Sequence, residues 1–203
     1  MRMNIRRHQQ EQPVSKSDVS DETLVVNTIS DKKQFVRLIE RYEKPLFRYL
    51  YRCGVATQED REDILQNVFM NVYKNLQQFD IRLSFSSWIY RITYNEAMTF
   101  FRKKKARPEI RLDANLESWI DLVRDETADT SAVARERLSS EIISQELSQL
   151  TKSYRDILVL RFFEDRSYRE ISDILTIPMG TVSTTVYRAK RALAARLARY
   201  TFN

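Results

Sequence analysis

Hydrophobic residues recur every three or four positions along two stretches of the chain, a spacing that predicts amphipathic helices. Three helices are predicted before residue 54, with Asp31 placed to cap the second and Gly54 placed to end the third. Two longer helices are predicted at 58–79 and 86–104. Helical periodicity returns at residue 138 and continues toward the C-terminus, so 138–203 forms a second helical stretch.

The composition changes outside these two stretches. Residues 1–19 are polar without periodicity and are expected to form a disordered tail. Residues 107–141 hold five arginines against nine acidic residues and few apolar ones, which predicts an extended acidic linker over 107–137. We therefore predict an all-α protein with two small helical domains, 20–106 and 138–203, joined by this acidic flexible linker.

Glycine is scarce, with only two, Gly54 and Gly180, in 203 residues. Hairpin turns and phosphate-binding loops depend on glycine, because it alone adopts positive φ at little cost. The scarcity excludes a dinucleotide-binding fingerprint and a P-loop, and it argues against a β-rich fold. Hydrophobic residues at 42% are sufficient to build helical cores.

The chain carries one cysteine, Cys53, and one histidine, His8. It therefore has no internal disulfide framework, no thiolate zinc site and no imidazole pair for metal or relay chemistry. We expect no cofactor, no metal and no enzymatic activity. The longest uncharged stretch, 174–187, is too short and too rich in Thr and Ser to span a bilayer. The N-terminus lacks a secretory signal, so the protein is expected to be cytoplasmic, with no membrane insertion of its own.

The C-terminal stretch contains a helix-turn-helix pattern. Ser167 and Glu170 have the S-x-x-E spacing of a capping box, which predicts the start of a short helix. A turn at 176–180 separates it from a second helix, and five basic residues but no acidic one lie in 178–203. Hydroxyls followed by cations suit the major groove of DNA, although a small bundle with a solvated charged face fits the same pattern. The outward positions of the second helix are Thr181, Thr184, Thr185 and Arg188.

Residues 82–107 combine seven basic residues with one acidic residue and interleaved aromatic residues. On a helix, Trp88 shares one face with Arg91, Asn95, Thr99 and Arg102. Aromatic rings stack on unpaired bases, amides read base edges and cations follow the phosphates. The face therefore predicts binding of an unstacked nucleic-acid strand. The open alternative is that Trp88 belongs to the core and the arginines only cover the surface around it.

The helix predicted at 58–79 carries a separate polar face opposite its apolar stripe. This face holds Asp63, Gln66, Asn67 and Met70 at spacings i, i+3, i+4 and i+7. It is either ordinary solvated helix surface or a docking site for another helix. An active site is not expected here, because no histidine, Gly-rich loop or second carboxylate cluster accompanies it.

Two motifs, in this order, resemble a known family. The first resembles conserved region 2 of the extracytoplasmic-function (group IV) sigma factors. It comprises 62–69 (EDILQNVF), Phe79, 85–92 (FSSWIYRI) and Asn95. The second resembles region 4 of the same family. It comprises 147–150 (LSQL), Arg155, 168–171 (YREI) and 177–182 (IPMGTV). The resemblance covers about 21–197 apart from the linker, which lies where larger sigma factors carry a third domain.

The resemblance implies a bacterial initiation factor that binds core RNA polymerase through the β′ clamp helices and the β flap. It also implies a promoter read in two pieces and an anti-sigma factor that occludes the binding faces. The acidic linker would then run toward the active-site and RNA-exit channels of the polymerase. The positions matching polymerase docking are Asp63, Gln66, Asn67 and Met70.

The same resemblance assigns two sets of residues to promoter DNA. Region 2 captures the melted non-template strand of the −10 element. Its matching positions are Asp80, Arg82, Phe85, Trp88, Arg91, Asn95, Thr99, Arg102 and Lys103. Region 4 places its second helix in the major groove of the −35 element. Its matching positions are Arg169, Thr181, Ser183, Thr184, Thr185, Arg188 and Arg191.

Five positions depart from the family pattern. Asn67 stands where Glu is usual, which makes the docking face less acidic. Thr99 stands where Asp or Asn is frequent, and Thr151 replaces a usual Pro. Ser183 and Thr185 stand where Lys and Arg are common, so the −35 contacts are weaker or read different bases. The sequence therefore does not predict which promoter is read.

A different class of protein fits the helix-turn-helix alone, namely a stand-alone repressor or activator with a helical sensing or dimerisation domain. Such a protein binds duplex DNA without polymerase, usually as a dimer on paired half-sites. The cationic stretch 82–107 and the absence of an evident dimer seam argue against it. A sigma-like protein serving as a phage or plasmid regulator stays open as a third interpretation.

Overall fold

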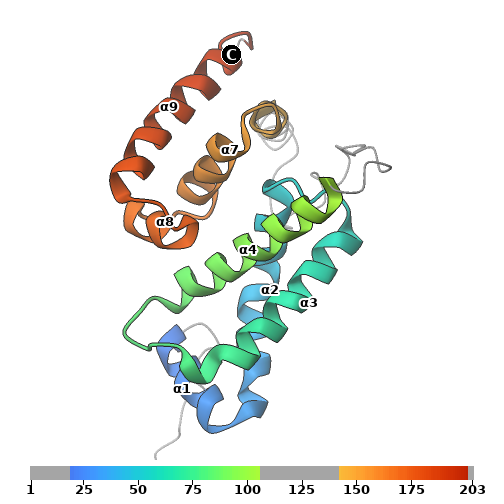
Figure 1. Ribbon diagram of the computed structural model, residues 1–203, viewed down its shortest axis with the longest axis vertical. Coiled ribbons are helices and arrows are strands. Elements are labelled where there is room, and N and C mark those ends of the chain that lie inside the picture. Colours follow the sequence, from blue (N-terminus) through green and yellow to red (C-terminus); the bar gives the residue numbers. More distant parts are fainter. Residues whose placement is uncertain (1–18, 106–141, 201–203) are drawn as a thin grey trace, which may run out of the picture.

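The computed structural model describes residues 19–105 and 142–200 (Figure 1). All regular elements within these ranges are helical, which confirms the all-α prediction. The predicted tail, apart from Val19, and the predicted linker 107–137 lie outside the described residues. None of the described helices is long and apolar enough to cross a membrane. Figure 1 shows two groups of helices, α1–α4 and α7–α9. Within the first group, α4 is the helix that faces the second group.

The first group contains four α-helices and two short 3-10 turns. They are α1 (Asp21–Ser30), η1 (Lys32–Gln34), α2 (Phe35–Arg52), α3 (Gln58–Asn75), η2 (Leu76–Gln78) and α4 (Phe85–Lys105). The prediction of three helices before residue 54 is wrong, because α2 continues through Pro45 as one helix. An interior proline costs about 3 kcal/mol. Along α2 this cost is offset by an unbroken buried stripe. The stripe consists of Leu38, Tyr42, Leu46, Tyr49 and Leu50.

The ends of these helices follow from local chemistry. The Thr57 hydroxyl accepts a hydrogen bond from the Asp60 amide and caps α3. Asp31 caps the η1 turn by accepting from the Lys33 amide, and α2 follows directly. Gly54 has φ +99°, so the predicted left-handed stop after α2 is confirmed. The helix predicted at 58–79 ends its α-helical part at Asn75 and continues as η2.

The second group forms the predicted helix-turn-helix. Residues 142–148 are helical and precede α7 (Lys152–Leu158), the π-helical turn η3 (Val159–Phe163), α8 (Tyr168–Leu175) and α9 (Met179–Leu197). Between α8 and α9 the chain turns through Thr176 at φ 56°, and the Ser172 hydroxyl donates to the Ile177 carbonyl at 2.6 Å. Val182 is fully buried at the junction of the two helices. The Ser172 hydrogen bond and the buried Val182 thus fix the angle between α8 and α9.

The capping box that begins α8 is expected to contribute measurably to stability. The Ser167 hydroxyl accepts from the Glu170 amide, and the Glu170 carboxylate accepts from the Ser167 amide at 2.9 Å. We expect Ser167→Ala to lower the free energy of unfolding by about 1 kcal/mol, a typical loss for a helix cap. Chemical denaturation followed by circular dichroism measures this change. The control Ser153→Ala, at an exposed position within α7, is expected to change stability by less than about 0.5 kcal/mol.

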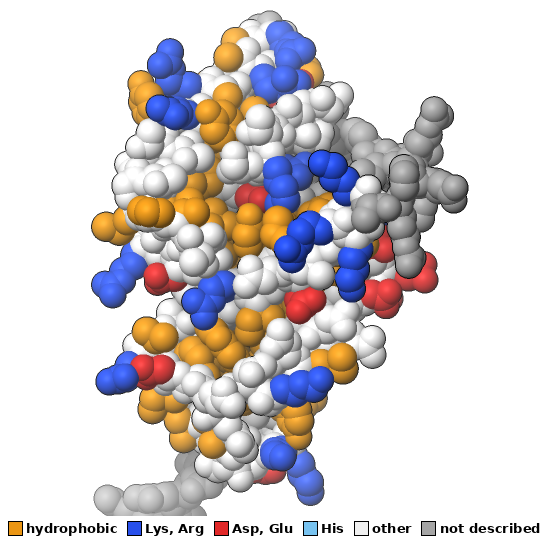
Figure 2. Space-filling view, viewed as in Figure 1, with side chains coloured by type: hydrophobic (Ala, Val, Ile, Leu, Met, Phe, Trp, Pro, Cys, Tyr) orange, Lys and Arg blue, Asp and Glu red, His pale blue; other side chains and the backbone are white. Residues whose placement is uncertain are grey.

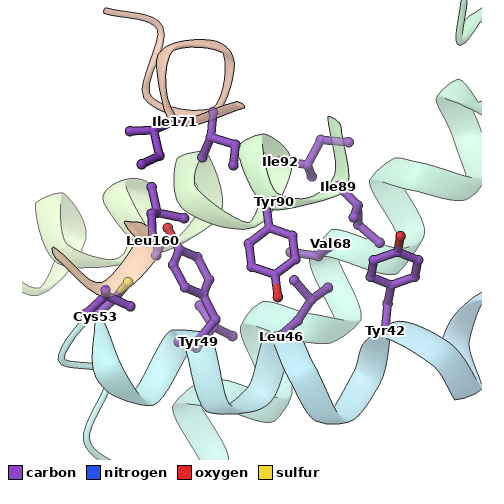
Figure 3. Packing of buried hydrophobic residues seen from close by; sticks show 14 of the residues in the cluster. Tyr42, Leu46, Tyr49, Cys53, Val68, Ile89, Tyr90, Ile92, Leu160 and Ile171 are labelled. Carbon is purple, nitrogen blue, oxygen red and sulfur yellow. The ribbon is translucent and has the colours of Figure 1, made fainter. Parts of the chain in front are cut away.

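The two groups of helices share one hydrophobic core. Helix α4 packs directly on α8, and the buried cluster runs without interruption from one group to the other. Figure 3 shows Leu160 and Ile171 of the second group close to Tyr49, Cys53 and Tyr90 of the first. The sequence predicted two domains and gave no indication that they pack together.

Candidate functional site

The polar face of α3 is fully available for contact. Asp63, Gln66, Asn67 and Met70 are all exposed, with Met70 exposed by 48%, while the opposite stripe is buried. The Asn67 amide donates to the Asp63 carbonyl at 2.9 Å and is thereby held along its own helix. We call these four residues the docking face. A polar rim around an exposed methionine is a surface on which another helix can dock.

The loop between η2 and α4 is ordered by one ion pair. The Arg82 guanidinium donates to both oxygens of Asp80, with its shortest contacts at 2.9 Å and 2.7 Å, and the Arg82 backbone amide donates to the same carboxylate. These hydrogen bonds lower the pKa of the Asp80 carboxyl from its usual 3.8 to about 2. The Arg82 side chain stays 86% exposed, so it is held in place yet accessible to a ligand.

Helix α4 presents the predicted polar and cationic side chains along one side. Arg91, Asn95 and Arg102 are exposed, and Thr99 is half-buried with its hydroxyl between the Asn95 carbonyl and Arg102. We call Trp88, Arg91, Asn95, Thr99 and Arg102 the reading face. The neighbouring Lys103 is exposed as well. On the face drawn in Figure 2, lysine and arginine side chains lie on both groups of helices, with acidic side chains among them.

Trp88 is partly a core residue and partly a surface residue, so each of the two interpretations raised by the sequence, core packing and base stacking, is possible for part of its ring. Its ring packs on Phe79 at 4.8 Å and on Phe85 at 5.7 Å between centroids, yet the side chain is only half-buried. One side of the indole therefore contributes to the core and the remainder is accessible. A ring braced in this way loses little entropy when a base stacks on it.

The prediction that Phe85 contacts the −10 element is wrong, because this side chain is buried. Its ring is 1% exposed and packs edge-on against Tyr42 and Phe79. The side chain begins α4 from inside the core, so it positions the loop and Trp88 without being accessible to DNA. Sequence position alone did not separate it from Trp88, because both are aromatic residues of the same motif.

A groove of about 370 Å³ lies beside Trp88, between the end of α3, the loop and α4. It brings together Asp80, Trp88 and Arg91 from the predicted set. The same groove holds three amides that sequence analysis missed. These are Asn71, Asn75 and Gln78. Their spacing of i, i+4 and i+7, continuing the polar side of the same helix beyond the docking face, is a signal in the sequence that could have found them.

The outward side of α9 carries the second set of predicted DNA contacts. Thr181, Ser183, Thr184, Arg188 and Arg191 are exposed, while Thr185 is half-buried. The Thr184 hydroxyl donates to the Gly180 carbonyl at 2.9 Å, which leaves its oxygen free to accept. Arg169, at the start of α8, is exposed too. The arrangement offers hydroxyls first and guanidinium groups further along, the order in which bases and phosphates are met in a major groove.

Comparison with known proteins identifies both halves of the chain. Residues 38–107 match the family model "Sigma-70 region 2", and residues 140–193 match "Sigma-70, region 4". The ECF RNA polymerase sigma factor SigW of Bacillus subtilis is 34% identical over 173 residues, spanning 82% of this chain and 90% of SigW. The chain belongs to the extracytoplasmic-function sigma factors. The ECF RNA polymerase sigma-E factor of Haemophilus influenzae is 28% identical over 172 residues, spanning 82% of this chain and 89% of that protein.

Solved structures agree on the fold. CnrH, solved in complex with the cytosolic domain of CnrY, superposes with a TM-score of 0.65 at 21% identity, covering 89% of this chain and 99% of CnrH. The sigma factor RpoE of Bartonella quintana, solved with the anti-sigma factor NepR, gives a TM-score of 0.64 at 18% identity. That match covers 83% of this chain and 99% of RpoE.

The family membership decides between the protein classes that the sequence left open. Both conserved regions are present in the family order, so this chain is an alternative sigma factor, a transcription initiation factor. A stand-alone helix-turn-helix regulator is not favoured, because it does not account for region 2. The docking face and the reading face both lie within region 2, and the outward side of α9 lies within region 4.

Proposed function

We propose that this sigma factor docks on core RNA polymerase through α3, captures the melted −10 strand along α4 and reads the −35 duplex with α9. The observation that carries the proposal is the simultaneous exposure of all three surfaces on one chain. The docking face, the reading face and the outward side of α9 are separate, solvent-accessible and chemically different. No bond-making step is assigned to this chain, since the polymerase performs the chemistry.

Strand capture by region 2 has a simple energetic basis. Separating DNA costs about 1.4 kcal/mol of stacking per base-pair step. A base that stacks on an aromatic side chain regains about 1–3 kcal/mol. We propose that Trp88 supplies the ring, and that Asn71, Asn75 and Gln78 contact base edges in the adjacent groove. Arg91, Arg102 and Lys103 then contact the phosphates.

Each of these surfaces is assigned to a different partner. We propose that the docking face meets the β′ clamp helices, that region 4 meets the β flap, and that an anti-sigma factor regulates the chain. Among the structural neighbours, RpoE was solved with the anti-sigma factor NepR and CnrH with the cytosolic domain of CnrY. The cytoplasm, where the polymerase acts, is the compartment that this function requires.

Run-off transcription tests the proposal directly. Fragmented genomic DNA of the source organism is transcribed by its core RNA polymerase, with and without the full chain, and the 5′ ends of transcripts are sequenced. We expect a defined set of start sites that appears only with the chain. Asp63→Arg on the docking face is expected to abolish these starts, whereas Glu40→Gln, an exposed position of α2, leaves them unchanged. Identical start sites with and without the chain contradict the proposal.

A further inference from the structure

A second groove, of about 530 Å³, lies along the C-terminal half of α4 and shares no lining residue with the groove beside Trp88. One wall is α4, and the other is Lys152, the first residue of α7. We call it the α4–α7 groove. Its volume falls within the range of about 300–1,000 Å³ that small-molecule sites occupy. Its other lining residues are Asn95, Met98, Thr99, Phe101, Arg102 and Lys105.

Three cationic side chains surround the α4–α7 groove. Arg102 and Lys105 are exposed and lie about one helical turn apart on α4. Within residues 19–105 and 142–200, no carboxylate pairs with either of them, and the Arg102 guanidinium donates only to the Thr99 hydroxyl, at 3.0 Å. Lys152 approaches from α7 with a side chain that is 37% exposed. The groove therefore presents positive charge from two helices to one space, which favours an anionic ligand.

The Lys152 ammonium group is held in place without losing its capacity to bind a ligand. It pairs with the buried Asp156 carboxylate, and it lies 5.1 Å from the centroid of the Tyr94 ring and 5.5 Å from that of Phe101. An ammonium group has three N–H donors. Asp156 accepts from one of them, so the others remain for an acceptor in the groove. Lys152 is thus a positioned cation, whose long side chain loses little further freedom when an anion binds.

The rest of the groove is apolar or neutral. Met98 and Phe101 line it and are half-buried, and the Phe101 ring is braced by Phe100 at 5.4 Å between centroids. Such a surface suits a planar ring, and the exposed Asn95 amide offers a donor and an acceptor beside it. Guanidinium and ammonium groups bind phosphate oxygens. A ligand that carries several phosphates and one planar base matches both parts of the groove.

We propose that the α4–α7 groove binds a nucleoside polyphosphate, with the phosphates between its three cations and the base against Phe101. One consequence rests on the proposed function. Asn95 and Arg102 line this groove and also belong to the reading face, so a bound nucleotide and a captured strand compete for the same side chains. By linkage, each lowers the affinity of the other by the same factor. Nucleotide binding thereby reduces promoter opening.

Calorimetric titration of the free full-length chain tests the site without polymerase. The probes are ATP, GTP and inorganic triphosphate, each titrated separately. Both nucleotides are expected to bind saturably with one site per chain. Inorganic triphosphate is expected to bind about 5- to 150-fold more weakly, the value of one base on an aromatic side chain. Equal affinity for triphosphate and the nucleotides means that the chain binds polyanions in general, and it overturns the assignment to a nucleoside.

Three variants locate the ligand in the groove. Lys105→Gln, at an exposed position, is expected to weaken nucleotide binding about 10-fold, the lower end of the range for losing a charge-assisted hydrogen bond. Lys152→Gln is expected to act in the same direction from α7. Phe101→Leu keeps an apolar side chain but removes the ring, so it is expected to weaken binding of the nucleotides and not of triphosphate. Lys33→Gln, which removes the same charge from an exposed position of η1, is the matched control and is expected to bind as the parent does. Unchanged helical content by circular dichroism shows that the variants fold.

Promoter opening by the complete polymerase tests the competition. Permanganate reactivity is measured at a start site that depends on the chain, with and without one nucleotide, and each chain is compared with its own opening in the absence of nucleotide. The nucleotide is expected to reduce opening by the parent chain more than opening by Lys105→Gln. Because both chains are assayed with the same polymerase, the difference between them isolates the α4–α7 groove.

The binding site and the competition fail separately. The absence of saturable nucleotide binding, or equal binding by the parent, Lys105→Gln and Lys152→Gln, overturns the site. A short single-stranded oligonucleotide that binds through Lys105 more tightly than ATP overturns the assignment to a free nucleotide. An equal effect of nucleotide on opening by the parent and Lys105→Gln overturns the competition alone. Start sites that do not depend on the chain contradict the proposed function, whereas binding measured by calorimetry still supports the site.

Discussion

Replacing Trp88 and Asn95 by alanine is expected to reduce promoter opening strongly while leaving polymerase binding unchanged. Trp88 is the ring of the reading face, braced by Phe79, and Asn95 lies exposed two turns further along α4. Losing one stacked base costs about 1–3 kcal/mol, which corresponds to roughly 5- to 150-fold in the amount of open complex. Permanganate reactivity of unpaired thymines measures opening, and co-purification with core polymerase measures docking.

Controls separate this effect from misfolding. Trp88→Ala removes part of the aromatic packing, whereas Asn95→Ala alters an exposed side chain, so the second variant alone is expected to reduce opening without a change in stability. Asn27→Ala, exposed on α1, is the matched control and is expected to open promoters normally. Full opening by the double variant, or loss of polymerase binding, contradicts the assignment of the reading face.

Leu160→Ala is expected to lower the free energy of unfolding by about 2–5 kcal/mol, the usual cost of truncating a buried leucine. Leu160 is fully buried in the cluster shared by the two groups of helices (Figure 3). Denaturant unfolding monitored by circular dichroism measures the loss. Leu83→Ala, at a loop position exposed by 59%, is the control and is expected to change stability by less than about 0.5 kcal/mol. A loss below about 1 kcal/mol for Leu160→Ala contradicts a shared core.

Periodicity predicted the helices whose apolar stripes are long and regular. Helix α4 was expected at 86–104 and spans Phe85–Lys105, and the capping box placed the start of α8 correctly. The continuity of α2 was missed because the sequence divided this stretch into two helices, whereas the buried stripe carries one helix through Pro45. Sequence periodicity and capping motifs therefore predict a helix correctly where the local preference of the residues agrees with their burial in the folded protein.

The site was harder to predict than the fold for a physical reason. Trp88 and Phe85 belong to one motif, but only the three-dimensional packing buries one ring and leaves the other accessible. The packing between the two groups of helices offered even less signal, since the Arg52 guanidinium and the Glu164 carboxylate, which form an ion pair across it, are 112 positions apart in the chain. The sequence around Arg52 does not identify Glu164 as its partner, and the sequence around Glu164 does not identify Arg52.

Helix α4 serves the core and the reading face from different sides. Tyr90 points toward region 4 and is 2% exposed, while the next residue, Arg91, lies on the reading face. Neighbouring positions of a helix differ by about 100° in direction, so the two side chains act on separate equilibria. Random mutagenesis of this one segment is therefore expected to yield different phenotypes from adjacent codons: poorly folded chains at position 90, and folded chains that do not open promoters at position 91.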